Sequence, residues 1–357
     1  MEYNVDKEKE FLQKKIDYNN NWNGSQIWRT ELQDQLDKRL ASKGFKQILV
    51  PVQLKADACD ILFKQENARL ARLLSNIVDI YDELPYRPDV AFDLAWRAFE
   101  ILLKTCCNNH DATKCLPIIA KEISFYANSN TKVADCLENI IAAQSLGSLT
   151  FCVNLFVKNN SNDVPDDYNL MYAPNTNKIT SRLKSALEGK KDINDSTFVY
   201  DMYVARYFNE DYYNKVKAKD YTANQTVAKA TQCLKNMMTT KATEQFYIKA
   251  ADDAETKVYF AGLDFNKRLE ALMGVVLYTI RNNRFHGDNT PLFKSSASGS
   301  TQYYSMYHCL IATYGLFWIL LHKYITDKGL GEFVTLDNIL KAVNESLDRL
   351  KATLPNK

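Results

Sequence analysis

Glycine and proline are scarce in this chain of 357 residues, which has 11 of the first and 8 of the second. A shortage of the residues that form tight turns favours long helices over a sheet with many short connections. The chain also lacks a charge surplus, because 45 Lys and Arg stand against 43 Asp and Glu. The net charge of +2 gives no overall attraction for nucleic acid, so such a partner would need a local basic patch.

Several other features are missing. Eight cysteines are too sparse for a disulfide framework. The charged start, MEYNVDKEKEFLQKK, has no apolar core of the kind found in a signal peptide. The most apolar run, Cys309 to Leu321, is too short to span a bilayer and is expected to be a buried helix. We therefore expect a cytoplasmic protein with reduced thiols and no membrane contact.

Known signatures of phosphate, dinucleotide and metal chemistry are absent as well. There is no Walker-type loop, no dinucleotide fingerprint and no carboxylate-rich metal site, which argues against an ATPase, a dehydrogenase or a two-metal nuclease. We expect no cofactor and no metal. Cys106, Cys107, His110 and Cys115 have residue types that bind zinc, but their spacing matches no established zinc motif. Buried thiols beside a turn explain this cluster more simply.

The apolar residues recur at helical spacing almost throughout, and alternation with a period of two is rare, so the sequence predicts an all-α fold without a sheet. Pro85 is expected to end one helix and Pro88 to begin the next. The helices are predicted over Ser25 to Ser42 (before Gly44), Ala56 to Leu84, Pro88 to Leu103, 112–126, 131–145, most of 178–262, Leu263 to Asn283, Tyr303 to Ile325 and Leu336 to Leu350. Between them, Phe45 to Leu54 is expected to be extended and Asn159 to Asn177 to be a loop.

Two short basic runs lie in the central part of the chain. Five positive residues and one Glu fall between Lys178 and Lys191, and Lys215, Lys217 and Lys219 follow later. The simplest interpretation of each run is a solvated helix face.

The segment IRNNRFHGD, residues 280–288, combines two arginines, two asparagines and one of the four histidines. Arg281 has a planar set of donors that fits phosphate oxygens. His286 can transfer a proton near neutral pH, and Asn282 can orient the histidine or bind the phosphate. Such a set of side chains can catalyse the attack of an RNA 2′-hydroxyl on the adjacent phosphate, which cleaves the RNA without a metal.

Helix geometry limits how this set can work. Arg281 and His286 are separated by about 140° around a regular helix. Either the helix unwinds near Phe285, or a second copy of the chain supplies the missing group across a two-fold axis. Lys267, Arg268 and Arg284 lie on or beside the same helix and are candidates for binding RNA.

Arg-Asn followed by three residues and His resembles the signature of the HEPN superfamily. The stretch from Asp93 to Leu103, with Trp96 and Phe99, is similar to an earlier helix of that family, and the apolar helix after the motif also fits. The resemblance covers residues 264–326, with 86–107 as a plausible addition.

The resemblance implies an all-α, HEPN-like bundle over 86–326 with a possible insertion over 159–262. Outside this range we expect an N-terminal helical extension over 1–85 and a C-terminal amphipathic helix over 327–357. The resemblance also implies a homodimeric endoribonuclease without a metal, in which Arg281 and His286 are catalytic, Asn282 supports them and the product carries a 2′,3′-cyclic phosphate. Family members act in toxin–antitoxin pairs, phage defence and RNA processing, so an antitoxin or regulatory partner is implied too.

Two other hypotheses remain open at this point. The chain could be a non-catalytic HEPN-like module that binds a nucleotide, RNA or a protein. It could also be a helical scaffold in which Arg281 and His286 only stabilise the negative end of a helix. His308 and His322 lie on the apolar 303–325 helix and are expected to be satisfied core or helix-edge histidines, although His308 could approach the motif helix if the two helices pack antiparallel.

Overall fold

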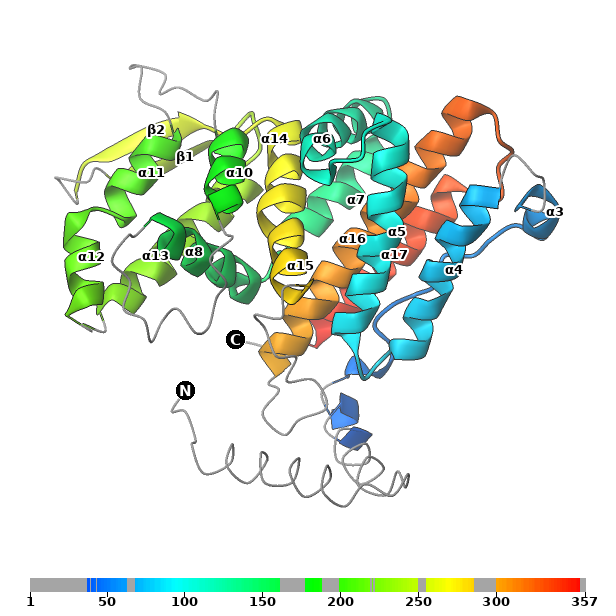
Figure 1. Ribbon diagram of the computed structural model, residues 1–357, viewed down its shortest axis with the longest axis horizontal. Helices are drawn as coiled ribbons and strands as arrows, with labels where there is room; N and C mark the ends of the chain where they lie inside the picture. The colour runs from blue at the N-terminus through cyan, green and yellow to red at the C-terminus, as the bar shows by residue number, and fades with distance from the viewer. Residues whose placement is uncertain are drawn as a thin grey trace.

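The computed structural model shows a protein that is mostly helical in its described residues, which also form a small hairpin (Figure 1). The structure describes residues 37–38, 40–42, 44–62, 68–160, 177–187, 199–218, 220, 222–249, 255–285 and 300–353. The predicted all-α class is confirmed. Much of the predicted Ser25 to Ser42 helix, most of the predicted loop over Asn159 to Asn177, and the segment from His286 to Gly299 lie outside the described residues.

One part of the molecule is a bundle around α16 (Ser300–Lys328), which packs along α5 (Pro88–Cys107) and α17 (Leu336–Ala352). The helix α4 (Ala68–Glu83) covers α5 from outside, and α6 (Ala112–Asn128) and α7 (Thr131–Ala142) complete the bundle. These helices share one continuous hydrophobic core with the rest of the described chain. The described parts of the predicted N-terminal and C-terminal extensions are therefore integral to this core.

Local sequence signals set the helix ends. Pro88 occupies the first turn of α5, where its missing N–H costs nothing, and Asn108 ends the helix in a left-handed conformation with φ of 48°. The side chains of Asp111, Asn130 and Thr335 accept hydrogen bonds from backbone N–H groups at the starts of α6, α7 and α17.

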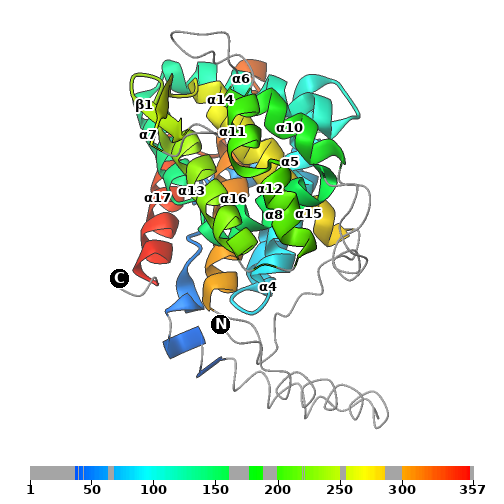
Figure 2. The same cartoon turned by 90° about the vertical axis from the view of Figure 1, so that its left-hand side faces the viewer.

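The other lobe contains α8 (Leu146–Asn160), α10 (Asn177–Leu187), α11 (Val199–Tyr207), α12 (Glu210–Lys217) and α13 (Thr222–Thr239) (Figures 1 and 2). Its edge carries an antiparallel hairpin of β1 (Gln245–Lys249) and β2 (Lys257–Ala261), with Tyr247 opposite Tyr259. The prediction that the chain has no sheet was wrong at this hairpin. Phe246 and Phe260 face the interior and stack, with ring centroids 5.6 Å apart.

Two predicted segments differ in detail from the structure. The predicted helix over Ala56 to Leu84 appears as α3 (Ala58–Leu62) and α4, with 63–67 outside the described residues. The predicted extended segment begins with a 3-10 turn, η1 (Phe45–Gln47), and then runs to a bridge between Leu54 and Val334. Gly44 precedes this turn at φ of 75°, a conformation that favours glycine.

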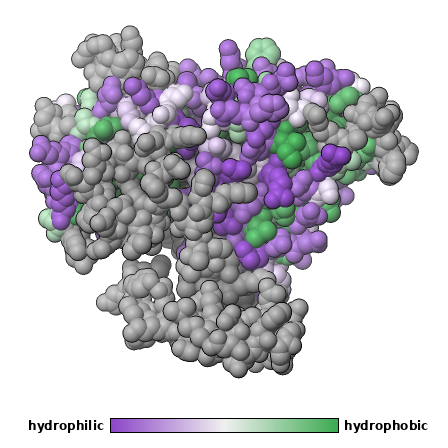
Figure 3. All heavy atoms as spheres, in the orientation of Figure 1, coloured by the Kyte–Doolittle hydropathy of each residue, from purple (hydrophilic) through white to green (hydrophobic). Residues whose placement is uncertain are grey.

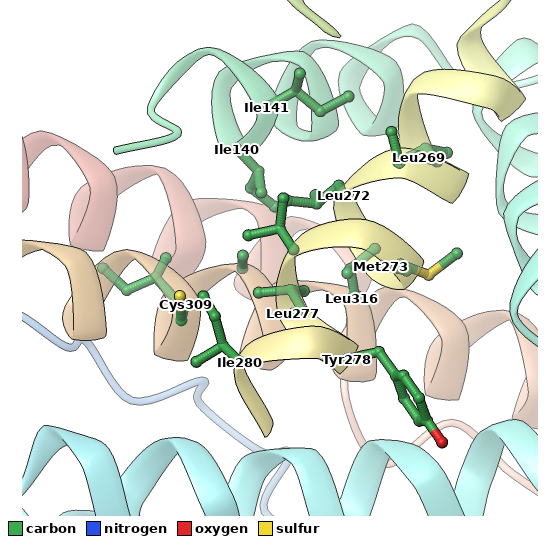
Figure 4. Packing of buried hydrophobic residues seen from close by; sticks show 14 of the residues in the cluster. Ile140, Ile141, Leu269, Leu272, Met273, Leu277, Tyr278, Ile280, Cys309 and Leu316 are labelled. Carbon is green, nitrogen blue, oxygen red and sulfur yellow. The ribbon is translucent and has the colours of Figure 1, made fainter. Parts of the chain in front are cut away.

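The motif helix lies between the two parts of the molecule. It consists of α14 (Phe265–Glu270), the π-helical segment η3 (Ala271–Leu277) and α15 (Tyr278–Phe285). Every residue from Arg268 to Ile280 is buried. Figure 4 shows side chains of this helix, Leu272 and Leu277 among them, packed against Ile140, Cys309 and Leu316. Because side chains from Arg268 to Ile280 are buried, the candidate functional side chains of the motif lie in the last turn of the helix.

The apolar helix α16 is longer than its most apolar run suggests. The stretch Gln302–Lys328 could cross a membrane by length and composition, but 83% of its most apolar window is buried inside the fold. This burial is that of a core helix, as predicted for the run from Cys309 to Leu321. The surface seen in Figure 3 mixes hydrophilic side chains with scattered hydrophobic ones.

Candidate functional site

The last turn of the motif helix faces one side of α5. Polar residues on α5 recur three or four positions apart, so they lie on a single helix face. Two arginines of α15 meet carboxylates of this face, although about 190 residues separate the partners in sequence. The face comprises Asp89, Asp93, Trp96, Glu100 and Lys104. The two segments that carry the HEPN resemblance therefore pack against each other.

Arg281 contacts Glu100 and Asn282. Its Nη2 lies 3.1 Å from Oε2 of Glu100, and its Nη1 donates to Oδ1 of Asn282 at 2.9 Å. The side chain remains 22% exposed. The guanidinium is thus oriented at the end of the motif helix, with part of its surface open to solvent.

Glu100 has more partners than Arg281 alone. Lys104 Nζ donates to its Oε1 at 2.7 Å, and Trp96 Nε1 donates to its Oε2 at 2.9 Å. Burial raises the pKa of the Glu100 carboxyl, but the Lys104 hydrogen bond, the Arg281 charge and the Trp96 N–H together hold the pKa below its usual value. The Glu100 carboxylate therefore contacts two cations, Lys104 and Arg281.

Arg284 has a different environment. Its Nε and Nη2 donate to Asp93 at 3.0 and 2.8 Å, and Nη2 also donates to Asp89 at 3.0 Å. Asp89 is fully buried and also accepts two hydrogen bonds from Arg87. Burial lowers the pKa of Arg284, but the hydrogen bonds and charges of the two aspartates outweigh it and raise the pKa. Arg87 and Arg284 neutralise Asp89 and Asp93. Arg284 therefore has a structural role, because its ion pairs join α15 to α5.

Lys267 and Arg268 also form hydrogen bonds and ion pairs within the fold. The guanidinium of Arg268 is 3% exposed and forms an ion pair with Glu138. Lys267 Nζ donates to the carbonyl of Ser185 at 2.8 Å and to Glu270 at 3.0 Å. Lys267, Arg268 and Arg284 thus each have partners within the fold, and the prediction that they bind RNA stays a prediction.

Of the remaining motif residues, Asn282 touches Arg281, and Asn283 is buried at 5% exposure. No described residue accepts a hydrogen bond from the amide nitrogen of Asn283. His286 lies outside the described residues, so its position relative to Arg281 stays a prediction. Tyr278, one turn before Arg281, contacts the Trp96 ring at 5.8 Å between centroids.

His308 and His322 lie in the core and at a helix edge as expected, but no described residue forms a hydrogen bond with the buried Nδ1 of His308, so this histidine is only partly satisfied. His308 is fully buried, with Nε2 3.0 Å from the carbonyl of Ile140, and burial lowers its pKa to about 4. His322 lies 3.1 Å from the Tyr126 hydroxyl and 3.5 Å from Glu332, and burial lowers its pKa. Neither histidine forms a described contact with Arg281 or Asn282.

Two thiols of the cysteine cluster contact backbone carbonyls. Cys107 Sγ lies 3.8 Å from the carbonyl of Cys115, and Cys115 Sγ lies 3.7 Å from that of Asn109. Burial raises the pKa of Cys106 and of Cys107 to about 12, which disfavours the thiolate form that binds zinc. Among the described residues, no group of three or more His, Cys, Asp or Glu could hold a metal ion.

Comparison of the chain with protein-family models, curated proteins and solved structures finds no match. The resemblance to the HEPN superfamily therefore rests on the motif and stays a prediction. Glu100 is the residue of this site that sequence reasoning missed. Its place on the Trp96 face, four residues from both Trp96 and Lys104, was a usable signal, but the pairing with Arg281 is a tertiary contact that local spacing does not reveal.

Proposed function

We propose that this protein is a metal-independent endoribonuclease of the HEPN type, which acts in the cytoplasm as a homodimer. Arg281 would bind the scissile phosphate, His286 would transfer protons and Asn282 would orient them. A toxin or phage-defence role, with an antitoxin or regulatory partner, is the context that the family resemblance favours.

The observation that carries this proposal is that Arg281 is held in place by Glu100 and Asn282 while part of its side chain stays exposed. Two arginines three residues apart end the same helix, yet their exposure differs, because 22% of the Arg281 side chain is exposed. Arg284 is 10% exposed and lies against two aspartates. An arginine held by Glu100 and Asn282 is already ordered, so it loses little conformational freedom when a phosphate arrives.

Residues of this chain can supply each catalytic group that the proposed reaction uses. The 2′-oxygen of the RNA attacks phosphorus while a histidine takes its proton, and the bond from phosphorus to the 5′-oxygen breaks as a second acid protonates that oxygen. The product ends are a 2′,3′-cyclic phosphate and a 5′-hydroxyl. His286 of each chain in a dimer would provide one base and one acid, and Arg281 would stabilise the charge that develops on the phosphorane.

Glu100 would serve as a positioning residue in this scheme. It contacts Arg281 rather than the substrate, and its bonds to Trp96 and Lys104 keep it fixed when Arg281 turns toward a phosphate.

A specific observation favours the second candidate, a non-catalytic binding module. Both terminal nitrogens of Arg281 already have acceptors in Glu100 and Asn282, an arrangement that also suits a purely structural or partner-binding helix end. Such a module would bind RNA or a protein without cleaving it.

A paired measurement of RNA binding and RNA cleavage separates these two functions. The wild type, Arg281→Met and the control Arg97→Met, which alters an exposed arginine on α5, are compared on tRNA, rRNA and mRNA. The nuclease proposal expects cleavage by the wild type and the control and its loss in Arg281→Met. Binding without cleavage by all three proteins would favour the module.

A further inference from the structure

Arg182 of α10 has an environment unlike that of the other arginines near the motif helix. Its Nη2 donates to Oγ1 of Thr279 at 2.9 Å, and its guanidinium carbon lies 4.9 Å from the centre of the Tyr278 ring. Arg182 belongs to the basic run from Lys178 to Lys191, which the sequence assigns to a solvated face. The structure instead turns Arg182 inward, against the first turn of α15.

Arg182 has no anionic partner among the described residues. No described group accepts a hydrogen bond from its Nε or Nη1, and both atoms are buried. The nearby groups that act on its charge are Tyr278 and Cys152, and burial raises the pKa of the Cys152 thiol far above its usual range. By contrast, Arg268, Arg281 and Arg284 each meet a carboxylate.

A buried cation without a counter-charge is costly for a fold. Burial lowers the pKa of Arg182 to about 10, so the guanidinium still carries its charge at neutral pH. Stacking on Tyr278 and one hydrogen bond to Thr279 offset only part of the desolvation. Buried polar atoms that lack partners are often explained by an ion or a water that binds there.

We propose that Arg182 anchors a binding site for a phosphate-type oxyanion at the junction of α10 and α15. The anion would accept a hydrogen bond from Nη1, one of the two donors without a described partner, while the hydrogen bond from Nη2 to Thr279 holds the plane of the guanidinium in place. Phosphate fits because arginine presents several N–H donors in one plane that match its oxygens.

The site adjoins the proposed catalytic group but is distinct from it. Tyr278 contacts both Arg182 and Trp96. Trp96 in turn donates a hydrogen bond to Glu100, which forms an ion pair with Arg281. A phosphate on a nucleotide or on RNA would therefore find a second cation next to the end of the motif helix. Binding at Arg182 does not require that the protein cleaves RNA, so a failure of the nuclease proposal would leave this site in place.

Thermal unfolding of the full chain with inorganic phosphate tests the proposal, with sodium chloride at matched ionic strength as the reference. A ligand that binds the folded state raises Tm with concentration, and a saturable rise of about 2 °C or more is expected for the wild type. Arg182→Met should lose this rise, and the control Arg97→Met should retain it. Without phosphate, Arg182→Met should unfold no earlier than the wild type, because it removes an uncompensated charge. An equal phosphate effect in the wild type and in Arg182→Met would overturn the proposal.

Calorimetric titration of the wild type with phosphate gives a result that does not depend on any variant folding. Saturable binding is expected, and its absence would also overturn the site. A second titration uses a mononucleotide. Tighter binding of the mononucleotide than of phosphate would identify a nucleotide or RNA phosphate as the ligand, and equal affinity would identify the free anion.

Discussion

Arg281 and Arg284 should differ in their contribution to stability, and the contrast can be calculated from their contacts. Arg284→Met leaves the fully buried Asp89 with Arg87 alone and leaves Asp93, 24% exposed, without its main partner. Breaking a buried ion pair costs about 3–5 kcal/mol, and the remaining Arg87 contact places this case at the lower end, about 3 kcal/mol.

Arg281→Met removes one ion pair from Glu100, which keeps Lys104 and Trp96 as donors. Because the Arg281 side chain is more exposed, the expected cost is about 1 kcal/mol. The two variants should therefore differ by about 2 kcal/mol in the free energy of unfolding.

Urea unfolding followed by tryptophan fluorescence measures this difference, since Trp96 lies at the same interface. The Arg97→Met control should match the wild type. If Arg281→Met were as destabilising as Arg284→Met, Arg281 would have the same structural role as Arg284. That result would refute the assignment of a functional role to Arg281 and a structural role to Arg284, and it would favour the scaffold hypothesis.

Three further predictions concern other parts of the structure. His308 has a folded pKa of about 4 against an ordinary 6.5, so the fold should lose about 3 kcal/mol as pH falls from 6.5 to 4, and His308→Gln should lose less when unfolding is followed across that range. In Gly262→Ala the new Cβ would lie 2.0 Å from a backbone carbonyl oxygen, so a loss of about 2 kcal/mol in a urea titration is expected, whereas Gly274→Ala meets only ordinary contacts and should fold normally. Glu100→Gln should lower kcat for RNA cleavage roughly tenfold with little change in KM, because Arg281 is less firmly positioned, and an increase in kcat would instead show that Glu100 competes with the phosphate.

Helix positions were largely predictable because their signals are local. Pro88 at the start of α5 and Asp111 at the start of α6 satisfy or remove donors that a helix end leaves open, and both lie where the sequence indicated. The hairpin was missed because its strands have only five residues each within a helical region. The alternation of Phe246 and Ile248 was present but too short to stand out.

The site was less predictable because its contacts are tertiary. The sequence distinguishes Arg281, as the arginine of the motif, from Arg284, but it does not reveal their different carboxylate partners on α5. Arg182 illustrates the same limit, since a basic run looks like a solvated face until the packing of α10 turns one member inward. The π-helical segment likewise could not be anticipated, because its residues, Ala271 to Leu277, have an ordinary helical apolar pattern.

The most direct test of the proposed function is RNA cleavage in EDTA by the purified full chain, with the wild type beside His286→Ala and with the product ends mapped. The account predicts 2′,3′-cyclic phosphate or 3′-phosphate ends together with 5′-hydroxyl ends from the wild type, and their loss in a folded His286→Ala variant. Cleavage that persists unchanged in His286→Ala, or no cleavage of tRNA, rRNA or mRNA by the folded wild type, would contradict it.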